Sequence, residues 1–247
     1  KKMTAGKKKE VEVETRIEEE FRGEEEEEGW LCSVSGEMVE VKSDSKSDSL
    51  IIQSQSEFSS GIILLSSPPP SFVESFPKNV YYEVKLKSAG LSQIGWATHL
   101  FKPNTESGDG VGDDSHSFGY DGSRRKKFTS GREEDYGEEW SKDDVIGCYC
   151  RYGNDGDDNN HKVSIGYSRN GVDMGVAFET ILESAGDENP TTLLYPAFSL
   201  NLEEEVVVRT KESEFEYCPK NEKEGGAYVQ IATFMTKSSG KSAAMDD

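Results

Sequence analysis

Four consecutive cations, Arg124, Arg125, Lys126 and Lys127, are the residues whose types and spacing most suggest recognition chemistry. They stand between a Gly-Tyr-Asp-Gly turn and a Ser-Gly turn, in a chain with 28 Lys and Arg against 48 Asp and Glu. Guanidinium and ammonium groups bind carboxylates or phosphates through charge-assisted hydrogen bonds, and one arginine can hold two oxygens of the same group. We therefore treat this basic tetrad as a candidate anion-binding site.

Two interpretations of the basic tetrad follow from its residues alone. Its four charges could bind RNA phosphates, which would make the affinity moderately dependent on salt concentration. Alternatively, the tetrad is a solvated turn whose charge is cancelled within the chain by the acidic residues that follow it: Glu133, Glu134, Asp135, Glu138 and Glu139. Exposed ion pairs of this kind contribute only about 0–1 kcal/mol to stability.

The sequence motifs do not support catalysis. The Gly-Lys-Ser at 240–242 would need a glycine five residues earlier to form a phosphate-binding loop, and that position is Met235. Paired carboxylates such as Asp143-Asp144 are frequent in an acidic chain, whereas a glycosidase needs two carboxyls at a fixed separation across a cleft. We therefore expect a chain that is not an enzyme, with no catalytic residues and no small-molecule substrate.

Motifs for metals and cofactors are incomplete. Cys148 and Cys150 are separated by one residue and have no second cysteine pair nearby, so zinc-site spacing is not met. The stretch 155–159 resembles the start of a calcium loop, but its sixth position is Asn160 rather than Gly and its twelfth is Gly166 rather than Glu. We expect no metal site and no cofactor.

The composition indicates an acidic chain that is only partly globular. A formal net charge of −20 opposes binding of nucleic acid or anionic lipid over the whole surface, so any such binding must be local. Apolar runs are far shorter than the roughly 20 residues of a transmembrane helix, and we expect no membrane partner. Four scattered cysteines favour reduced thiols over a secreted disulfide framework, which indicates an intracellular protein of the nucleus, the cytoplasm or both.

The elements that must position these residues are short strands. Apolar and polar residues alternate with a period of two in segments 80–86 and 144–153, which is the pattern of a strand with one buried face. Asn170-Gly171 lies between two further runs of this kind and predicts a hairpin, because a type I′ turn needs positive φ at both positions. About a dozen such strands with turns between them predict an all-β fold, an antiparallel β-sandwich of two twisted sheets.

The composition also divides the chain into three parts. We expect a charged, disordered leader over 1–29, a sandwich over 30–218 with its core motifs in 80–210, and a polar tail over 219–247. Within the tail, only 227–234 suggests one more strand. The large or apolar side chains that we assign to the core of the sandwich are Tyr82, Trp96, Ile146, Cys148 and Phe178.

Six segments, taken in order, resemble the SPRY domain family. They are YYEVKL, QIGWAT, HSFGYDG, YGEEWSKDDVIGCY, VSIGYSRNGVDMGVAFE and LLYPAFSL, which extend from residue 81 to residue 200. Within the family they look most like the SPRY domains of a DEAD-box RNA helicase and of heterogeneous nuclear ribonucleoprotein U. Both have a glycine-aromatic-glycine turn followed by paired lysines, and the corresponding basic turn here is DGSRRKKF. The acidic-aromatic stretch 212–220 favours the helicase branch.

This resemblance implies a non-catalytic protein–protein interaction module of a larger, RNA-processing protein. Its partner, a protein or peptide that is acidic if the arginines bind it, would contact loops at one end of the sandwich. The basic tetrad would lie on this rim, beside three aromatic anchors: Tyr120, Trp140 and Trp96, the last of which we also assign to the core. The alternative is an RNA-contacting accessory domain that uses the basic turn 124–127. Because residue 1 is a lysine, we interpret the chain as a piece of a longer protein.

Overall fold

The computed structural model describes residues 30–41, 49–64, 79–88, 90–104, 107–154, 160–183, 193–217 and 229–230. One group of strands comprises β1 (Trp30–Ser35), β4 (Ser59–Leu64), β6 (Ser92–Ala97), β7 (Ser117–Asp121), β8 (Lys126–Thr129), β9 (Arg132–Asp135) and β13 (Tyr195–Leu200). The other comprises β2 (Met38–Val41), β3 (Leu50–Ser54), β5 (Asn79–Leu86), β10 (Val145–Asn154), β11 (Asn160–Arg169), β12 (Val172–Glu183), β14 (Glu205–Arg209) and β15 (Val229–Gln230). A single 3-10 turn, η2 (Glu212–Glu214), is the only helical element in these ranges.

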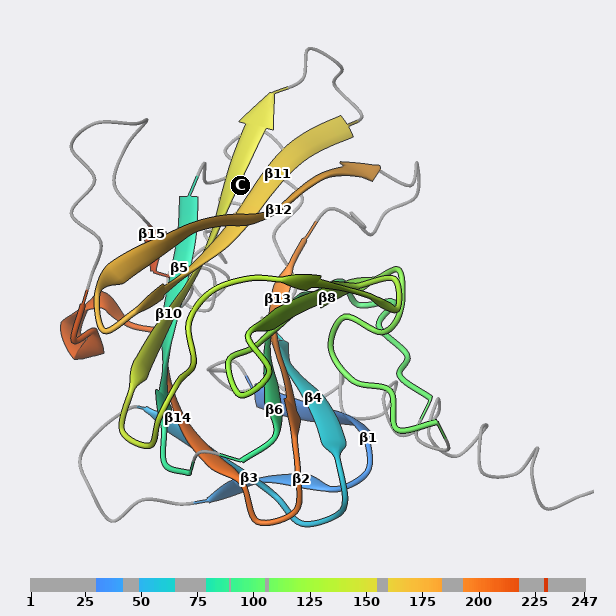
Figure 1. The fold of residues 1–247 in the computed structure, drawn as a ribbon, viewed down its shortest axis with the longest axis vertical. Helices are drawn as coiled ribbons and strands as arrows, with labels where there is room; N and C mark the ends of the chain where they lie inside the picture. The colour runs from blue at the N-terminus through green and yellow to red at the C-terminus, as the bar shows by residue number, and fades with distance from the viewer. Residues whose placement is uncertain are drawn as a thin grey trace, which may run out of the picture.

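The strands form two sheets that face each other (Figure 1). The first sheet has the order β1-β4-β13-β6-β7-β8-β9, and the second has the order β12-β11-β10-β5-β14-β3-β2. Neighbours along both paths are antiparallel, whereas β15 pairs in parallel with the beginning of β5. The expected all-β antiparallel sandwich is therefore confirmed.

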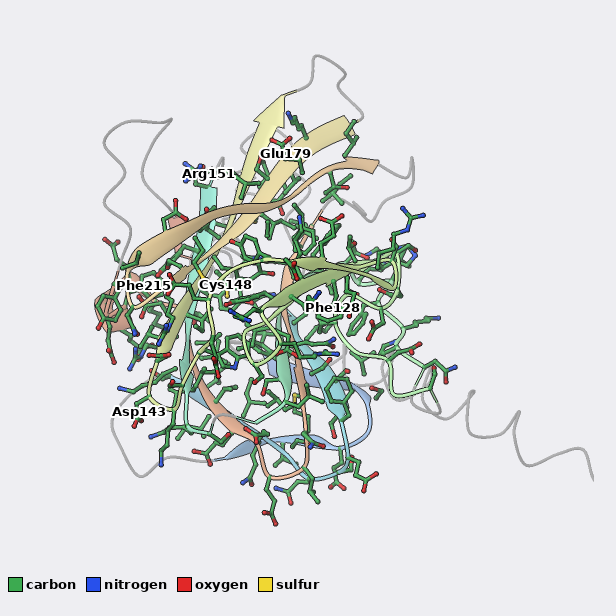
Figure 2. The ribbon with its side chains drawn as sticks, in the orientation of Figure 1. Phe128, Asp143, Cys148, Arg151, Glu179 and Phe215 are labelled. Atoms are coloured by element: carbon green, nitrogen blue, oxygen red, sulfur yellow. The ribbon has the colours of Figure 1, made fainter. Side chains whose placement is uncertain are left out.

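The alternation of side chains along the strands fills the space between the sheets. Tyr82, Val84 and Leu86 of β5 enter one continuous core together with Ile146 and Cys148 of β10, as expected for residues two apart on a strand. Trp96 and Phe178 are also buried in this core, and the ring of Trp96 lies edge-on to Tyr82 at 4.9 Å. Figure 2 shows Cys148 in the interior of the molecule.

A close contact between β6 and β7 depends on the absence of a side chain at Gly95. A Cβ atom at this position would lie 1.9 Å from the carbonyl oxygen of Phe118, on the neighbouring strand. Real Cβ atoms essentially never approach an atom within 3.0 Å. Glycine at position 95 therefore allows the two strands to pair while Trp96, the next residue, occupies the core.

The segment that follows β14 is fixed to the outer face of the second sheet by one buried carboxylate. Glu83 of β5 is 0% exposed and accepts the backbone N–H groups of Glu216 and Tyr217, each at 2.7 Å. Arg209 lies between two carboxylates, with Nη1 3.4 Å from Glu83 and Nη2 2.6 Å from Glu216. Phe215 adds an edge-on ring contact with Tyr81, with ring centroids 4.9 Å apart. Figure 2 labels Phe215 at the left of the molecule.

The β11–β12 connection forms the hairpin that Asn170-Gly171 predicted, with φ of +50° at Asn170 and +79° at Gly171. The leader over 1–29, the calcium-like stretch 155–159, the Gly-Lys-Ser at 240–242 and the tail apart from 229–230 lie outside the described residues. Among the described residues, the structure has no helix that is long and apolar enough to cross a membrane.

Candidate functional site

The basic tetrad lies where β7 turns into β8 and along the first half of β8. β8 pairs with β7 on one side and with β9 on the other, and Ser130 and Gly131, both with positive φ, join β8 to β9. We call these last two strands the β8–β9 ribbon. In this ribbon Lys126 pairs with Asp135 and Lys127 with Glu134, so the acidic strand runs directly beside the cations. The side chains of the four tetrad residues have different environments, which the sequence does not show.

Arg124 is bound by a buried carboxylate. Its Nε donates to Oδ2 of Asp121 at 2.6 Å, and its backbone N–H donates to Oδ1 of the same residue at 3.1 Å. The Asp121 side chain has no exposed surface, and a buried charge of this kind requires a partner. The guanidinium also lies 4.5 Å from the ring centroid of Phe128, in cation–π geometry. Arg124 is therefore committed to the fold, although its side chain is partly exposed.

Lys126 and Lys127 are paired with β9. Lys126 Nζ lies 2.8 Å from Asp135 and 3.7 Å from Glu133, and Lys127 Nζ lies 3.0 Å from Glu134. The carboxylates are largely exposed, so each pair contributes only about 0–1 kcal/mol. The interpretation that the tetrad is cancelled within the chain thus agrees with the geometry of both lysines.

Lys127 has a second role, because it connects the two sheets. Its Nζ donates to the carbonyl oxygen of Ala177 in β12 at 2.6 Å, and lies 5.3 Å from the ring centroid of Phe178. Removing this cation would therefore affect β12 as well as the ribbon.

Arg125 differs from the other three. Its side chain is exposed, and within the described residues it has no ion pair or side-chain hydrogen bond. Its backbone is left-handed, with φ of +54°, and its carbonyl oxygen accepts the N–H of Tyr136 at 3.0 Å. A left-handed conformation is uncommon for a residue other than glycine. The turn thus presents one arginine to solvent from a backbone that is itself hydrogen-bonded.

The two aromatic residues expected to act as anchors on the rim lie in the core instead. Tyr120 is 0% exposed and Trp140 is 4% exposed, with their ring centroids 5.1 Å apart. The Tyr120 hydroxyl donates to the carbonyl oxygen of Glu138, and burial raises its pKa to about 12. Trp140 Nε1 donates to Ser123 Oγ at 3.3 Å. Neither ring is exposed to a partner, so the expectation that they act as anchors on the rim is corrected. Both side chains instead hold loops in place from the core.

Trp96, named as a third anchor, is also fully buried. The physical reason is the same for all three rings. Each lies on the inner face of its strand or loop, where a large ring loses the most contact with water. The rings lie near the tetrad in the sequence, but they project into the core, whereas the cations project toward the surface.

A second set of polar contacts at the same end was missed by the sequence analysis. Asp144 accepts from Arg169 Nε at 2.8 Å, from Asn170 Nδ2 at 2.7 Å and from the backbone N–H of Ser141 at 2.7 Å. Burial opposes ionisation of Asp144, but the hydrogen bonds from Asn170 and Arg169 outweigh it and lower its pKa. The signal in the sequence was Asn170 itself, which was interpreted as a turn former only.

The chemistry of the described residues does not resemble a metal site or a reactive centre. No group of three or more His, Cys, Asp or Glu side chains in the described ranges is arranged to hold a metal ion. Cys148 and Cys150 are free thiols within the core, and burial raises the pKa of both. A thiol with a raised pKa is a poor nucleophile at neutral pH, so these cysteines act as small apolar side chains.

Comparisons with known proteins agree with the sandwich. Residues 79–213 match the family model described as the SPRY domain. The chain is 39% identical over 120 residues to E3 ubiquitin-protein ligase RKP of Arabidopsis thaliana, which covers 49% of this chain and 8% of that protein. It is 32% identical over 97 residues to the human Heterogeneous nuclear ribonucleoprotein U-like protein 2, covering 39% of this chain and 11% of that protein.

A third curated relative is the Probable ATP-dependent RNA helicase ddx1 of Dictyostelium discoideum, 32% identical over 140 residues, covering 57% of this chain and 14% of that protein. Among solved structures, the SPRY domain of human HERC1 matches with a TM-score of 0.45 at 14% identity, covering 64% of this chain and 87% of that chain. The chain spans only 8% to 14% of the length of these curated relatives. Because the family model matches more than half of its residues, the chain belongs to the SPRY domain family.

Proposed function

We propose that this chain is the protein-interaction module of a larger, RNA-processing protein, and that it binds a protein or peptide partner through loops at one end of the sandwich. SPRY domains are non-catalytic modules, which supports recognition rather than turnover. The names of two relatives, a ribonucleoprotein and an RNA helicase, support the association with RNA processing and an intracellular location. The ubiquitin ligase among the relatives shows that the same module occurs in other settings.

The observation that carries the proposal is a rim of four segments that are hydrogen-bonded to one another. We define this rim as four segments: residues 87–88 with 90–91, 122–125, 136–144, and 170–171. Ser123 Oγ donates to the carbonyl oxygen of Gly90 at 3.1 Å and accepts from Trp140, so it joins three of the four segments. Asp144 joins the third segment to the fourth through Asn170. Loops that are held in this way lose little conformational entropy when a partner binds.

Backbone conformations on the rim also support a binding role. Three of the six non-glycine residues with positive φ in the described ranges lie here: Arg125, Asp143 and Asn170. Asn170 adopts this conformation as part of the β11–β12 hairpin, and Asp tolerates it better than most residues. For Arg125 it costs energy, of order 1–3 kcal/mol, and such residues cluster at binding sites where the surrounding structure enforces them. Figure 2 labels Asp143 at the lower left of the molecule.

Arg125 is the residue of the rim through which we expect a partner carboxylate to bind. It is the member of the tetrad without an ion pair among the described residues, so a partner need not displace an internal carboxylate to reach it. Arginine is enriched among the residues that dominate binding energy at protein interfaces, since its planar fork can bind both oxygens of a carboxylate. In its most specific form, the proposal is that an acidic residue of the partner binds Arg125.

The test compares two single substitutions that change the net charge equally. Arg125→Ala removes the exposed arginine of the rim, whereas Arg132→Ala removes an exposed arginine at the opposite end of the β8–β9 ribbon. Proteins that cross-link to the wild-type chain would be quantified by mass spectrometry for both variants. We expect Arg125→Ala to lose a defined set of partners by roughly tenfold or more, and Arg132→Ala to retain them. Equal retention by both variants would overturn the rim as the binding surface.

A separate variant addresses the RNA alternative. Binding of a fluorescent single-stranded RNA would be measured at two salt concentrations for the wild type and for a variant with alanine at all four tetrad positions. A salt slope that falls by roughly one for each cation removed would favour RNA contact over our proposal. We expect no such change, because three of the four cations already have carboxylate partners.

A further inference from the structure

β12 is an outer strand of the second sheet, so one of its two edges has no neighbouring strand in the sheet path. Outer strands expose a row of N–H and C=O groups that can pair with another extended chain. In Figure 1, β12 runs along the outside of β11 to the upper right of the molecule. Which of its main-chain groups face outward can be worked out from the register of the sheet.

The hydrogen bonds of Val145 fix this pattern at the beginning of β10. Its N–H donates to Asn170 Oδ1 at 2.9 Å, and its carbonyl oxygen accepts the N–H of Asn170 at 2.8 Å, so both groups face β11. Strand residues alternate in the direction of their main-chain groups, and the β10–β11 register is continuous up to Arg151 opposite Ser164. The main-chain groups of Arg151 therefore face β11, and those of Ser164 face β10.

The same alternation continues into β12. Val163 and Ile165, the neighbours of Ser164, must face β12, where they pair with Thr180 and Phe178. The main-chain groups of Glu179, which lies between these two, then face away from the sheet, and so do those of Ile181. Ala177 lies at a bulge, because Ile165 pairs with Phe178 while the next residue pairs with Val176.

The first half of this edge is covered by side chains from the other layer. Tyr136 donates its hydroxyl to the carbonyl oxygen of Gly175 at 2.6 Å, and Lys127 donates to that of Ala177 at 2.6 Å. No hydrogen bond from another described residue reaches the outward N–H or C=O groups of Glu179 or Ile181. β9, the outer strand of the first sheet, is protected differently: all four of its residues are charged and exposed, which is the usual defence of an edge.

The side chains beside the open main-chain groups are suited to an extended partner. Ile181 is 57% exposed, one of the most exposed large apolar side chains in the described ranges. Glu179 is exposed on the same side of the strand, 3.8 Å from Lys162 of β11, and is labelled on β12 in Figure 2. Thr180, between them, faces inward beside the buried Phe178. Cross-strand neighbours on one face of an antiparallel pair stabilise each other when they are apolar pairs or opposite charges.

We propose that residues 179–181 of β12 bind an extended segment of a partner protein by strand addition, with a basic residue opposite Glu179 and apolar residues opposite Thr180 and Ile181. Main-chain hydrogen bonds would supply affinity, and the side chains would select the segment. A second copy of this chain is disfavoured as the occupant, because two molecules of net charge −20 repel each other. Residues 179–181 do not belong to the rim that carries the proposed function, although Tyr136 of the rim covers an earlier part of the same edge.

The first test uses proline to remove one outward N–H. Ile181→Pro deletes a donor that does not belong to the β11–β12 ladder, so the sheet should be retained, since proline is tolerated at the free edge of a strand. Ile181→Thr shortens the apolar side chain but retains the N–H. The probe is a fluorescent hexapeptide with blocked ends and the central order Val-Val-Lys, titrated into the full 247-residue chain. We expect Ile181→Pro to weaken binding roughly tenfold or more, and Ile181→Thr to weaken it several-fold less.

Two further arms keep the proposal testable if Ile181→Pro does not fold. N-methylation of the peptide bond nitrogens that face β12 should abolish binding, and equal binding of the methylated peptide would refute strand addition. Glu179→Lys should weaken the lysine peptide and strengthen a peptide with glutamate at that position. Unchanged preference would overturn the assigned partner chemistry.

Sedimentation would test whether a second copy of the chain occupies the edge. A wild-type dimer that is lost in Ile181→Pro would identify a second copy as the occupant and overturn the assignment of a basic partner.

Discussion

Replacing the buried carboxylate of Glu83 by an amide tests how the exit segment is fixed to the second sheet. Glu83→Gln keeps the size and shape of the side chain but leaves one acceptor oxygen where two backbone N–H groups converge, those of Glu216 and Tyr217. The new amide nitrogen would oppose one of these donors. Arg209 would also lose the charge of Glu83 and retain only that of Glu216.

The expected loss of stability follows from these contacts. A hydrogen bond to a charged group contributes about 1.5–3 kcal/mol, and leaving a buried donor unpaired costs about 1–3 kcal/mol. Breaking a buried ion pair from one side costs about 3–5 kcal/mol, but Glu216 still neutralises Arg209, which reduces this contribution. We expect Glu83→Gln to lower the free energy of unfolding by roughly 2–4 kcal/mol, a large fraction of the stability of a single domain.

Urea unfolding followed by tryptophan fluorescence would measure this loss. The matched control is Glu216→Gln, which makes the same chemical change in a side chain that is 38% exposed and should cost no more than about 1 kcal/mol. Limited proteolysis adds a local readout, because cleavage within 211–217 should accelerate in Glu83→Gln before the domain unfolds. A Glu83→Gln variant within about 0.5 kcal/mol of wild type would refute the reasoning that this carboxylate anchors the segment.

Three other predictions rest on the core and the rim. Asp144→Asn should destabilise the domain at neutral pH and progressively less in acid. The pKa of Asp144 is lower in the folded state than its unfolded value of about 3.9, so the carboxylate stabilises the fold above that value and this stabilisation is lost as the pH falls through the folded pKa. The urea midpoints of the wild type and the variant should therefore converge in acid. Burial raises the pKa of Cys148 and Cys150, so in a chain without its other cysteines Ellman's reagent should react with neither until urea is added; rapid reaction of the native protein would contradict the core assignment. Gly95→Ala should prevent soluble expression, because its Cβ would lie 1.9 Å from a carbonyl oxygen, whereas Gly153→Ala, whose nearest contact would be 3.8 Å, should express and melt like the wild type.

The local pattern of the sequence was sufficient for the architecture and for much of the core. Alternation with a period of two identified the strands, and Asn170-Gly171 identified a hairpin, because these signals depend on backbone geometry over a few residues. All five side chains assigned to the core from the sequence, among them Ile146 and Cys148 two residues apart on β10, are buried in the structure. The alternation did not show that the outer faces of these central strands are buried as well, where Tyr81 is 0% and Tyr149 is 4% exposed.

The candidate site depended on tertiary structure. The acidic run after the tetrad was visible in the sequence, but the pairing of Lys126 with Asp135 required the register of the β8–β9 ribbon. The burial of Tyr120 and Trp140 required loop 136–144 to pack against β7, since an aromatic residue with a polar tip suits both a core and an interface. Local propensity determined where strands form. The fate of each charged or amphipathic side chain was decided by neighbours distant in sequence, because charge pairing and exclusion of water act through space.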